Sequence, residues 1–357
     1  MTVRKFTLTP VRITVALTAA FLGVLVLAGR RHTLTKDSRN MALDDRGRHA
    51  TVPEQLPLIG LRDVFWRVVR GVSDDRVTLI AAGVTFYLLL AIFPALAALV
   101  SLYGLAADPT VLPQHLRELA GVLPPGAFDL FSDQISVLTA KPRGTLGIAF
   151  FVSLAIALWS THSGTLALFD AMNVAYEERE KRSFLQLNLI ALCFTLCAMI
   201  SAAAAVGLVA ILPVLLANLW LDRSHEELAL LARWPVLALL IVSAILAIYR
   251  FGPSREPARL RWMTWGAALT VLAWLAMSFV FSFYLSHFAN YNATYGTLGA
   301  LIGFLIWTWL SVTILLIGAE LNAELERQTE KDSTTGSPRP MGVRGAHAAD
   351  TLGEPVD

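Results

Sequence analysis

A histidine stands near the middle of an apolar stretch, in the run Ser-Thr-His-Ser at 160–163. The surrounding residues 144–169 contain no Asp, Glu, Lys or Arg. An imidazole at that depth is a candidate for proton transfer or ligand binding, because burying it without partners is costly. The alternative for His162 is a neutral ring that hydrogen bonds to a hydroxyl or carbonyl on an adjacent helix. A proton relay would need a second acid at similar depth, and the sequence offers none.

Three polar residues follow this stretch at helical spacing. Asp170, Asn173 and Glu177 stand at i, i+3 and i+7 and so share one helix face. They suit a polar helix end that meets lipid headgroups, with Glu178 and Arg182 as an i, i+4 ion pair. They equally suit a site in which Asp170 and Asn173 contact neighbouring helices and line the inner end of a cavity. The sequence leaves both interpretations open.

A second polar group, Glu320 and Asn322, ends the last apolar stretch of the chain. Glu320 is either an interfacial carboxylate or the partner of an inner-loop arginine such as Arg250. The chain's seven histidines are scattered, without the spacing of a metal-ligand motif. We therefore expect no catalytic residue, no bound metal and no cofactor.

A long uncharged run shows what must position these residues. Trp262–Ala319 is 58 residues long without one Asp, Glu, Lys or Arg, and as one helix it would measure about 87 Å against a hydrocarbon core of about 30 Å. It must fold back on itself, and the turn is polar but uncharged. That turn is either a structural hairpin or the outer lip of a transport path, and its residues are Asn290, Tyr291, Asn292, Thr294, Tyr295 and Gly296. Gly299 and Gly303 then give the last helix a small face for close helix packing.

The composition is that of a polytopic membrane protein. Hydrophobic residues make up 55% of the chain, charged residues 16%, and the mean hydropathy is +0.59. We predict an all-α fold with a six-helix core, long enough in two spans for kinks at Pro94 and Pro213. The predicted spans are 77–107, 144–169, 184–219, 234–249, 262–289 and 296–319.

Basic residues near the span ends predict the orientation. Thirteen Lys and Arg residues flank the ends on one side of the core and five lie in the loops of the other. By the positive-inside rule, both ends of the six-helix core are cytoplasmic.

Amphipathic helices are predicted beside this core. From residue 61 the apolar positions recur at i, i+3, i+4 and i+7, which indicates a helix lying on a membrane surface. Its apolar face would hold Leu61, Val64, Phe65, Val68, Val69 and Val72, and its polar face Arg62, Asp63, Arg67 and Arg70. The outer loop 108–143 is expected to form two short interfacial helices.

The chain divides into three parts. Residues 1–57 form an N-terminal extension with a hydrophobic segment at 13–29 and a flexible arm at 30–57. A seventh span at 13–29 conflicts with the charge rule, so either the natural start is Met41 or an extra helix is tolerated. The membrane domain occupies 58–327, and 328–357 is expected to be a disordered cytoplasmic tail.

Four motifs resemble one family. They are Gly-Val-Thr-Phe-Tyr at 83–87 with Phe93-Pro94, Asn-Val-Ala-Tyr-Glu-Glu-Arg-Glu at 173–180, Tyr-Asn-Ala-Thr-Tyr-Gly at 291–296, and Gly-Ala-Glu-Leu-Asn at 318–322. Over roughly 60–327 the chain is similar to the YihY/BrkB family of bacterial inner-membrane proteins, once labelled ribonuclease BN. The resemblance implies six spans in the inner membrane.

The residues argue against a nuclease, which needs carboxylates or histidines gathered around metal ions in water. Two hypotheses remain. One is a transporter, exporter or flippase for a lipid or amphipathic solute. The other is a non-transporting scaffold that assembles with envelope proteins or with copies of itself. Membrane lipids are partners in both, and nucleic acid in neither.

Overall fold

The described residues form an all-α protein, as the sequence predicts. A computed structural model describes residues 46–106, 146–206, 208, 223–287 and 298–356, and no β-strand occurs among them. Three short elements are η1 (Pro53–Gln55), α3 (Leu58–Asp74) and α14 (His347–Asp350). The long helices are α4 (Val77–Ala106), α7 (Leu146–Ala175), α8 (Phe184–Val206), α10 (Arg223–Phe251), α11 (Leu260–His287) and α13 (Leu298–Glu326).

The long helices coincide with the predicted spans. Four described segments are long and apolar enough to cross a membrane: Phe184–Ala205, Leu231–Phe251, Leu260–Leu285 and Leu301–Glu326. Only 6% of the span in α10 and 11% of that in α8 is buried. Such apolar surface must be covered by hydrocarbon, so this is a multi-pass membrane protein.

Two helices extend beyond the predicted spans into polar residues. α13 continues to Glu326, seven residues beyond the expected limit at 319, because its last two turns are polar and packed. α10 begins at Arg223, well before residue 234. Pro94 lies inside an unbroken α4.

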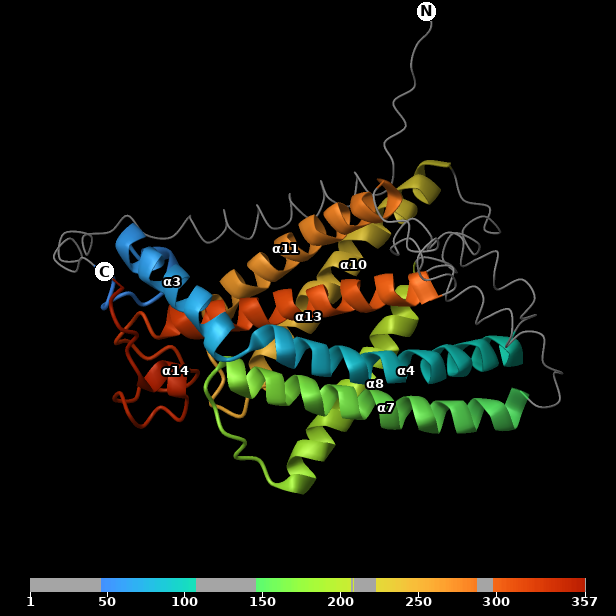
Figure 1. The fold of residues 1–357 in the computed structure, drawn as a ribbon, viewed down its shortest axis with the longest axis horizontal. Coiled ribbons are helices and arrows are strands. Elements are labelled where there is room, and N and C mark those ends of the chain that lie inside the picture. The colour runs from blue at the N-terminus through green and yellow to red at the C-terminus, as the bar shows by residue number, and fades with distance from the viewer. Residues whose placement is uncertain (1–45, 107–145, 207, 209–222, 288–297, 357) are drawn as a thin grey trace, which may run out of the picture.

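The helices converge at one end. In Figure 1, α4, α7, α11 and α13 run lengthwise, and α3 and the C-terminal segment gather at their left end. We call this the polar end; it comprises α3, the start of α4, the ends of α7 and α13, the α10–α11 connection and the C-terminal segment 327–356. Much of the buried hydrophobic core lies here, including Phe169, Met172, Trp262, Met263 and Leu316.

α3 presents a different face from the one its apolar spacing predicts. Val64 and Val68 are buried, but so are Asp63 and Arg67, which bind groups of the polar end. The exposed face instead combines apolar side chains with two arginines: Leu58, Ile59, Phe65, Trp66 and Val69 with Arg62 and Arg70. The apolar face is divided because the polar end buries charged partners of α3 as well as hydrophobic side chains.

Two helix ends use left-handed residues that are not glycine. α7 ends in a Schellman arrangement, in which the Glu178 N–H bonds to the Asn173 carbonyl (2.8 Å) and the Glu177 N–H to that of Val174 (2.9 Å). Glu177 has a φ of 52°, as does Arg76 between α3 and α4. Non-glycine residues in this region are uncommon and mildly strained. Glu177 is held there by an ion pair to Arg327 at 2.6 Å.

Two glycines set the closest helix crossing. A Cβ on Gly266 of α11 would clash with the Gly318 carbonyl, and one on Gly318 with Thr270 and Tyr249. The Gly266 N–H donates to Asn322 Oδ1 at 2.9 Å. By contrast, a Cβ on Gly303, one of the predicted packing glycines, would meet Leu285 at an ordinary 3.9 Å. Gly299 is buried, and α11 and α13 approach most closely at Gly266 and Gly318.

The C-terminal segment is ordered, in contrast to the disordered tail predicted for 328–357. Arg344 is 4% exposed and donates to the backbone oxygens of Glu330 and Ala349, both at 2.6 Å. The Glu330 N–H bonds to the Arg48 carbonyl at 2.8 Å, so part of the predicted flexible arm is also ordered. The polar composition of 328–357 suggested disorder. The segment is nevertheless ordered, because its polar groups form hydrogen bonds with segments that are distant in the sequence.

Four predicted features lie outside the described residues. They are the hydrophobic segment 13–29, the outer loop 108–143, the kink at Pro213 and the turn from Asn290 to Gly296.

We predict that Gly266→Ala destabilises the fold by about 1–3 kcal/mol, because the added methyl group overpacks the α11–α13 crossing. Gly303→Ala is the matched control on the same helix pair. It is expected to be neutral or stabilising by up to about 1 kcal/mol, because its methyl group fits and alanine favours helix. Thermal unfolding of the purified protein in detergent measures both, and equal effects would contradict this account of the crossing.

Candidate functional site

The structure brings together three of the five predicted site residues at the polar end. Asn173, Glu320 and Asn322 are all buried there, on two helices and far apart in sequence. Asp170 is exposed, and His162 lies two turns earlier on α7. The polar face predicted from Asp170 to Glu177 is therefore divided between solvent or lipid and the protein interior.

The Glu320 side chain interacts with that of Asp75, the residue that caps the end of α3. Burial raises the pKa of the Asp75 carboxyl above its ordinary value; the interaction with Glu320 opposes this, and the charges of Glu177 and Asp74 add to the rise. Glu320 is 4% exposed. It is thus neither the interfacial carboxylate nor the partner of Arg250 that the sequence suggested, and Arg250 donates to the Ala258 carbonyl instead.

Three buried polar atoms lie close to this pair without a hydrogen-bond partner in the structure. They are Glu320 Oε1, the Tyr176 hydroxyl and Asn322 Nδ2. Electrostatic interactions link the Tyr176 hydroxyl to both Asn322 and Glu320.

A chain of charges connects α3 to the end of α13. Arg67, itself buried, binds the Glu324 carboxylate at 2.5 Å and Gln328 Oε1 at 2.8 Å. Arg327 binds Glu177 at 2.6 Å and Glu324 at 2.9 Å. The chain neutralises both acids next to the carboxyl pair and ties α3, α7 and α13 together.

A fully buried ion pair joins the α10–α11 connection to α13. Arg255 and Glu326 are 2% and 0% exposed and lie 2.6 Å apart. The guanidinium also covers the Tyr176 ring, 5.1 Å from its centroid. The Ser333 hydroxyl donates to the same Glu326 oxygen at 2.5 Å, so the C-terminal segment contributes to this pair.

Side-chain hydrogen bonds fold the polar segment that follows α7 into a corner. Asn173 accepts from the Ser254 N–H at 2.7 Å and donates to Glu180 at 3.0 Å. Hydrogen bonds from Arg182 lower the pKa of Glu180 to about 2. The predicted Glu178–Arg182 pair is absent from this corner, since Arg182 binds Glu180 and Glu178 binds Lys181 at 2.8 Å.

His162 makes the kind of contact with an adjacent helix that one of its two alternatives requires. Its Nε2 lies 3.0 Å from the amide oxygen of Asn188 on α8. Its Nδ1 is buried and has no hydrogen-bond partner. The ring therefore links α7 to α8 and lies apart from the carboxyl pair.

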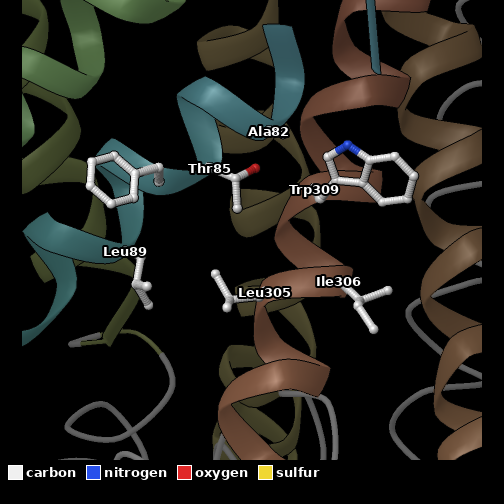
Figure 2. A pocket seen from close by; sticks show the side chains of 7 residues that line it. Ala82, Thr85, Leu89, Leu305, Ile306 and Trp309 are labelled. Atoms are coloured by element: carbon white, nitrogen blue, oxygen red, sulfur yellow. The ribbon is translucent and has the colours of Figure 1, made fainter. Parts of the chain in front are cut away.

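An apolar groove opens between α4 and α13, further along the bundle than the carboxyl pair. Its volume is about 310 Å³, at the lower end of ligand-binding pockets. The only polar lining side chains are Thr85, whose hydroxyl donates to its own helix at Ala81, and Trp309, whose indole donates to the Thr78 carbonyl at 2.8 Å. Figure 2 shows the lining residues on the two helices: Ala82, Thr85, Phe86, Leu89, Leu305, Ile306 and Trp309.

Sequence reasoning missed Asp75, Arg255 and Arg327 as members of the site. Each lies at a helix end or in a connection, where a charged residue usually faces water. No local signal distinguishes them as members of the site, because each has a partner that is 71 to 245 residues away. Within the part of the chain that the structure describes, no group of three or more His, Cys, Asp or Glu residues is arranged to hold a metal ion.

Comparison with known proteins supports the resemblance. A family model described as Virulence factor BrkB matches residues 68–341, which extends beyond the boundary predicted at 327. A protein of Bacillus subtilis (strain 168) named ribonuclease-like protein YfkH is 31% identical over 280 residues, covering 75% of this chain and 95% of that protein. No solved structure matches the chain significantly.

We predict that Arg255→Met costs about 3–5 kcal/mol, because it leaves the Glu326 carboxylate buried without its cation. Arg339→Met is the matched control. Its exposed side chain faces Glu256 at 3.9 Å, and its loss is expected to cost at most about 1 kcal/mol. Unfolding in detergent measures both changes. A double variant, Arg255→Met with Glu326→Leu, should recover part of the loss, and a further loss would contradict an ion pair at this position.

Proposed function

This multi-pass membrane protein belongs to the virulence factor BrkB family, and we propose that it moves a lipid or an amphipathic solute along the seam between α4 and α13. The observation that carries the proposal is the apolar groove on this seam. The groove lies between α4 and α13, and α13 is long and apolar enough to cross a membrane. In this proposal a hydrocarbon chain reaches the groove from the membrane without passing through water.

The chemistry of the groove favours a hydrocarbon ligand. Its lining carries no charged side chain, and its two polar groups are already hydrogen-bonded to backbone carbonyls. A polar solute would therefore lose its hydration without gaining partners there. An acyl or polyisoprenoid chain would lose nothing, and its headgroup would stay near the membrane surface.

The seam is closed towards the polar end by polar contacts rather than by apolar packing alone. The Trp309 indole binds the Thr78 carbonyl, and about three turns further along α13 the Glu320 side chain interacts with Asp75. Hydrogen bonds are directional and few, so such a closure separates at lower cost than an interdigitated core. This arrangement supports a seam that opens during translocation.

We further propose that the protein is not an enzyme, although its relative is named ribonuclease-like. The carboxylates of the polar end are engaged within the fold: Glu177, Glu324 and Glu326 bind arginines, and Glu320 binds Asp75. Acids held in this way are not available to bind metal ions for phosphodiester cleavage.

We place the protein in the bacterial inner membrane with the polar end in the cytoplasm. Two observations support this orientation. Lys and Arg are concentrated around the span ends on that side. The exposed face of α3, directly before α4, combines Phe65 and Trp66 with Arg62 and Arg70, a composition suited to a headgroup layer.

The test is translocation in liposomes that contain the purified protein, with labelled phospholipids and lipid-linked precursors as probes. Wild-type protein is expected to move at least one probe faster than empty vesicles do. We predict that Ala82→Phe slows it by about tenfold, equivalent to 1.4 kcal/mol, because the ring fills the groove. Ala276→Phe, at an exposed alanine of α11, is the matched control and should have no effect.

Equal rates in empty and protein-containing vesicles would overturn the proposal and favour the non-transporting envelope scaffold. If Ala82→Phe and Ala276→Phe behave alike while the wild type is active, the α4–α13 groove is not the path.

A further inference from the structure

We propose that the exposed face of α3 binds anionic phospholipids, with its arginines on the headgroup phosphates and its apolar side chains in the membrane interface. The proposal rests on the placement of the polar end at a membrane surface and names the lipid class that this surface presents. It is independent of translocation along the groove.

α3 exposes apolar side chains and buries two charged ones, the reverse of a helix on the surface of a soluble protein. Asp63 pairs with Arg46 at 2.7 Å and Arg67 pairs with Glu324, and both α3 residues are less than a tenth exposed. Five large apolar side chains are between 46% and 84% exposed: Leu58, Ile59, Phe65, Trp66 and Val69. An apolar surface of this extent marks a contact with a partner or a membrane.

Polar segments of the protein cover the opposite side of α3. The Arg67 guanidinium donates to the Glu354 carbonyl at 3.1 Å, and the Val356 N–H donates to the Asp63 carboxylate at 3.3 Å. Figure 1 shows this C-terminal segment, in red, beside α3. The C-terminal segment therefore occupies the charged side of the helix and leaves the apolar side open.

The apolar side of α3 is continuous with a membrane helix. Only residues 75 and 76 separate α3 from α4, which has no Asp, Glu, Lys or Arg over its 30 residues. Leu79, in the first turn of α4, is 64% exposed. Because a helix of this composition lies in the bilayer, α3 is held at the bilayer surface, where the membrane interface covers apolar side chains.

Two arginines and an aromatic ring form a row along the exposed face. Arg62, Trp66 and Arg70 stand at i, i+4 and i+8, so each is one turn from the next. Tryptophan favours the level of the headgroups, and the flexible stem of an arginine reaches from there to a phosphate. A guanidinium binds phosphate through two parallel hydrogen bonds. The row therefore fits the phosphates of lipid headgroups.

The positive charge of this face is not neutralised within the described part of the protein. Arg62, Arg70 and Arg76 have exposed side chains and form no ion pair there. Arg62 makes one long hydrogen bond, 3.5 Å, to the Val356 carbonyl. Asp74 is the one exposed acid of α3. Three cations against one anion favour a negatively charged lipid over a zwitterionic one, by about fivefold for each arginine near the surface.

Spin labels in nanodiscs report where α3 lies. In a protein with Cys193→Ser and Cys197→Ser, Val69→Cys labels the exposed face of α3 and Ser337→Cys labels an exposed position of the C-terminal segment. Oxygen is concentrated in hydrocarbon and a neutral nickel chelate in water, so the two relaxation agents measure depth. In nanodiscs that contain phosphatidylglycerol, we expect the label at 69 to meet oxygen more than nickel, and the label at 337 to show the reverse.

The lipid class is tested with the same label at 69 in detergent micelles, by titration with phosphatidylglycerol or phosphatidylcholine. Wild-type protein should respond to phosphatidylglycerol at the lower concentration. Arg62→Gln with Arg70→Gln is expected to raise the phosphatidylglycerol concentration at half-saturation by about fivefold or more. Lys331→Gln with Arg339→Gln is the matched control, because it removes two exposed charges from the C-terminal segment, and it should leave the titration unchanged.

A label at 69 that meets nickel more than oxygen would place the face in water and overturn the proposal. A label screened from both agents would show that a second copy or another protein covers the face, with the same consequence. Equal half-saturation by the two lipids, or by wild type and the Arg62–Arg70 variant, would remove anionic lipid as the partner. These readouts do not involve probe movement, so failure of lipid binding and failure of translocation are told apart.

Discussion

The last two turns of α13 carry buried polar side chains at every second position, and the polar end depends on satisfying them. In a helix, residues four apart share a face, so Glu320 and Glu324 face one way and Asn322 and Glu326 the other. The first face binds α3 through Asp75 and Arg67; the second binds α11 through Gly266 and the α10–α11 connection through Arg255. Because unpaired buried charge is so costly, each neighbour is held in one register on α13.

The need to pair these buried polar groups explains why two of the family-like motifs, 173–180 and 318–322, contain so many polar residues. In Gly318-Ala319-Glu320-Leu321-Asn322, the glycine permits the helix crossing, Ala319 is fully buried, and the two polar residues bind opposite neighbours. In the segment after α7, Asn173 binds the α10–α11 connection and Glu177 binds Arg327. These residues hold the bundle together, so a role in folding accounts for them without any catalytic chemistry.

The groove and the polar end of the bundle share two helices, α4 and α13. Both helices line the groove, and the Trp309 indole of α13 joins them by donating to the Thr78 carbonyl of α4.

The sequence by itself determined the helical spans, since 58 uncharged residues leave a membrane chain no alternative to hydrogen-bonded helices, and it singled out Asn173, Glu320 and Asn322 as candidate polar residues of two separate segments. It did not reveal the partners. Tertiary structure alone decided that Asp75, Arg255 and Arg327 belong to the site. It also decided which face α3 buries and that the C-terminal segment is ordered. The physical reason is that apolar periodicity is a local property, whereas a buried charge is stabilised by whichever opposite charge or hydrogen-bond partner the fold brings within about 3 Å, at any distance along the chain.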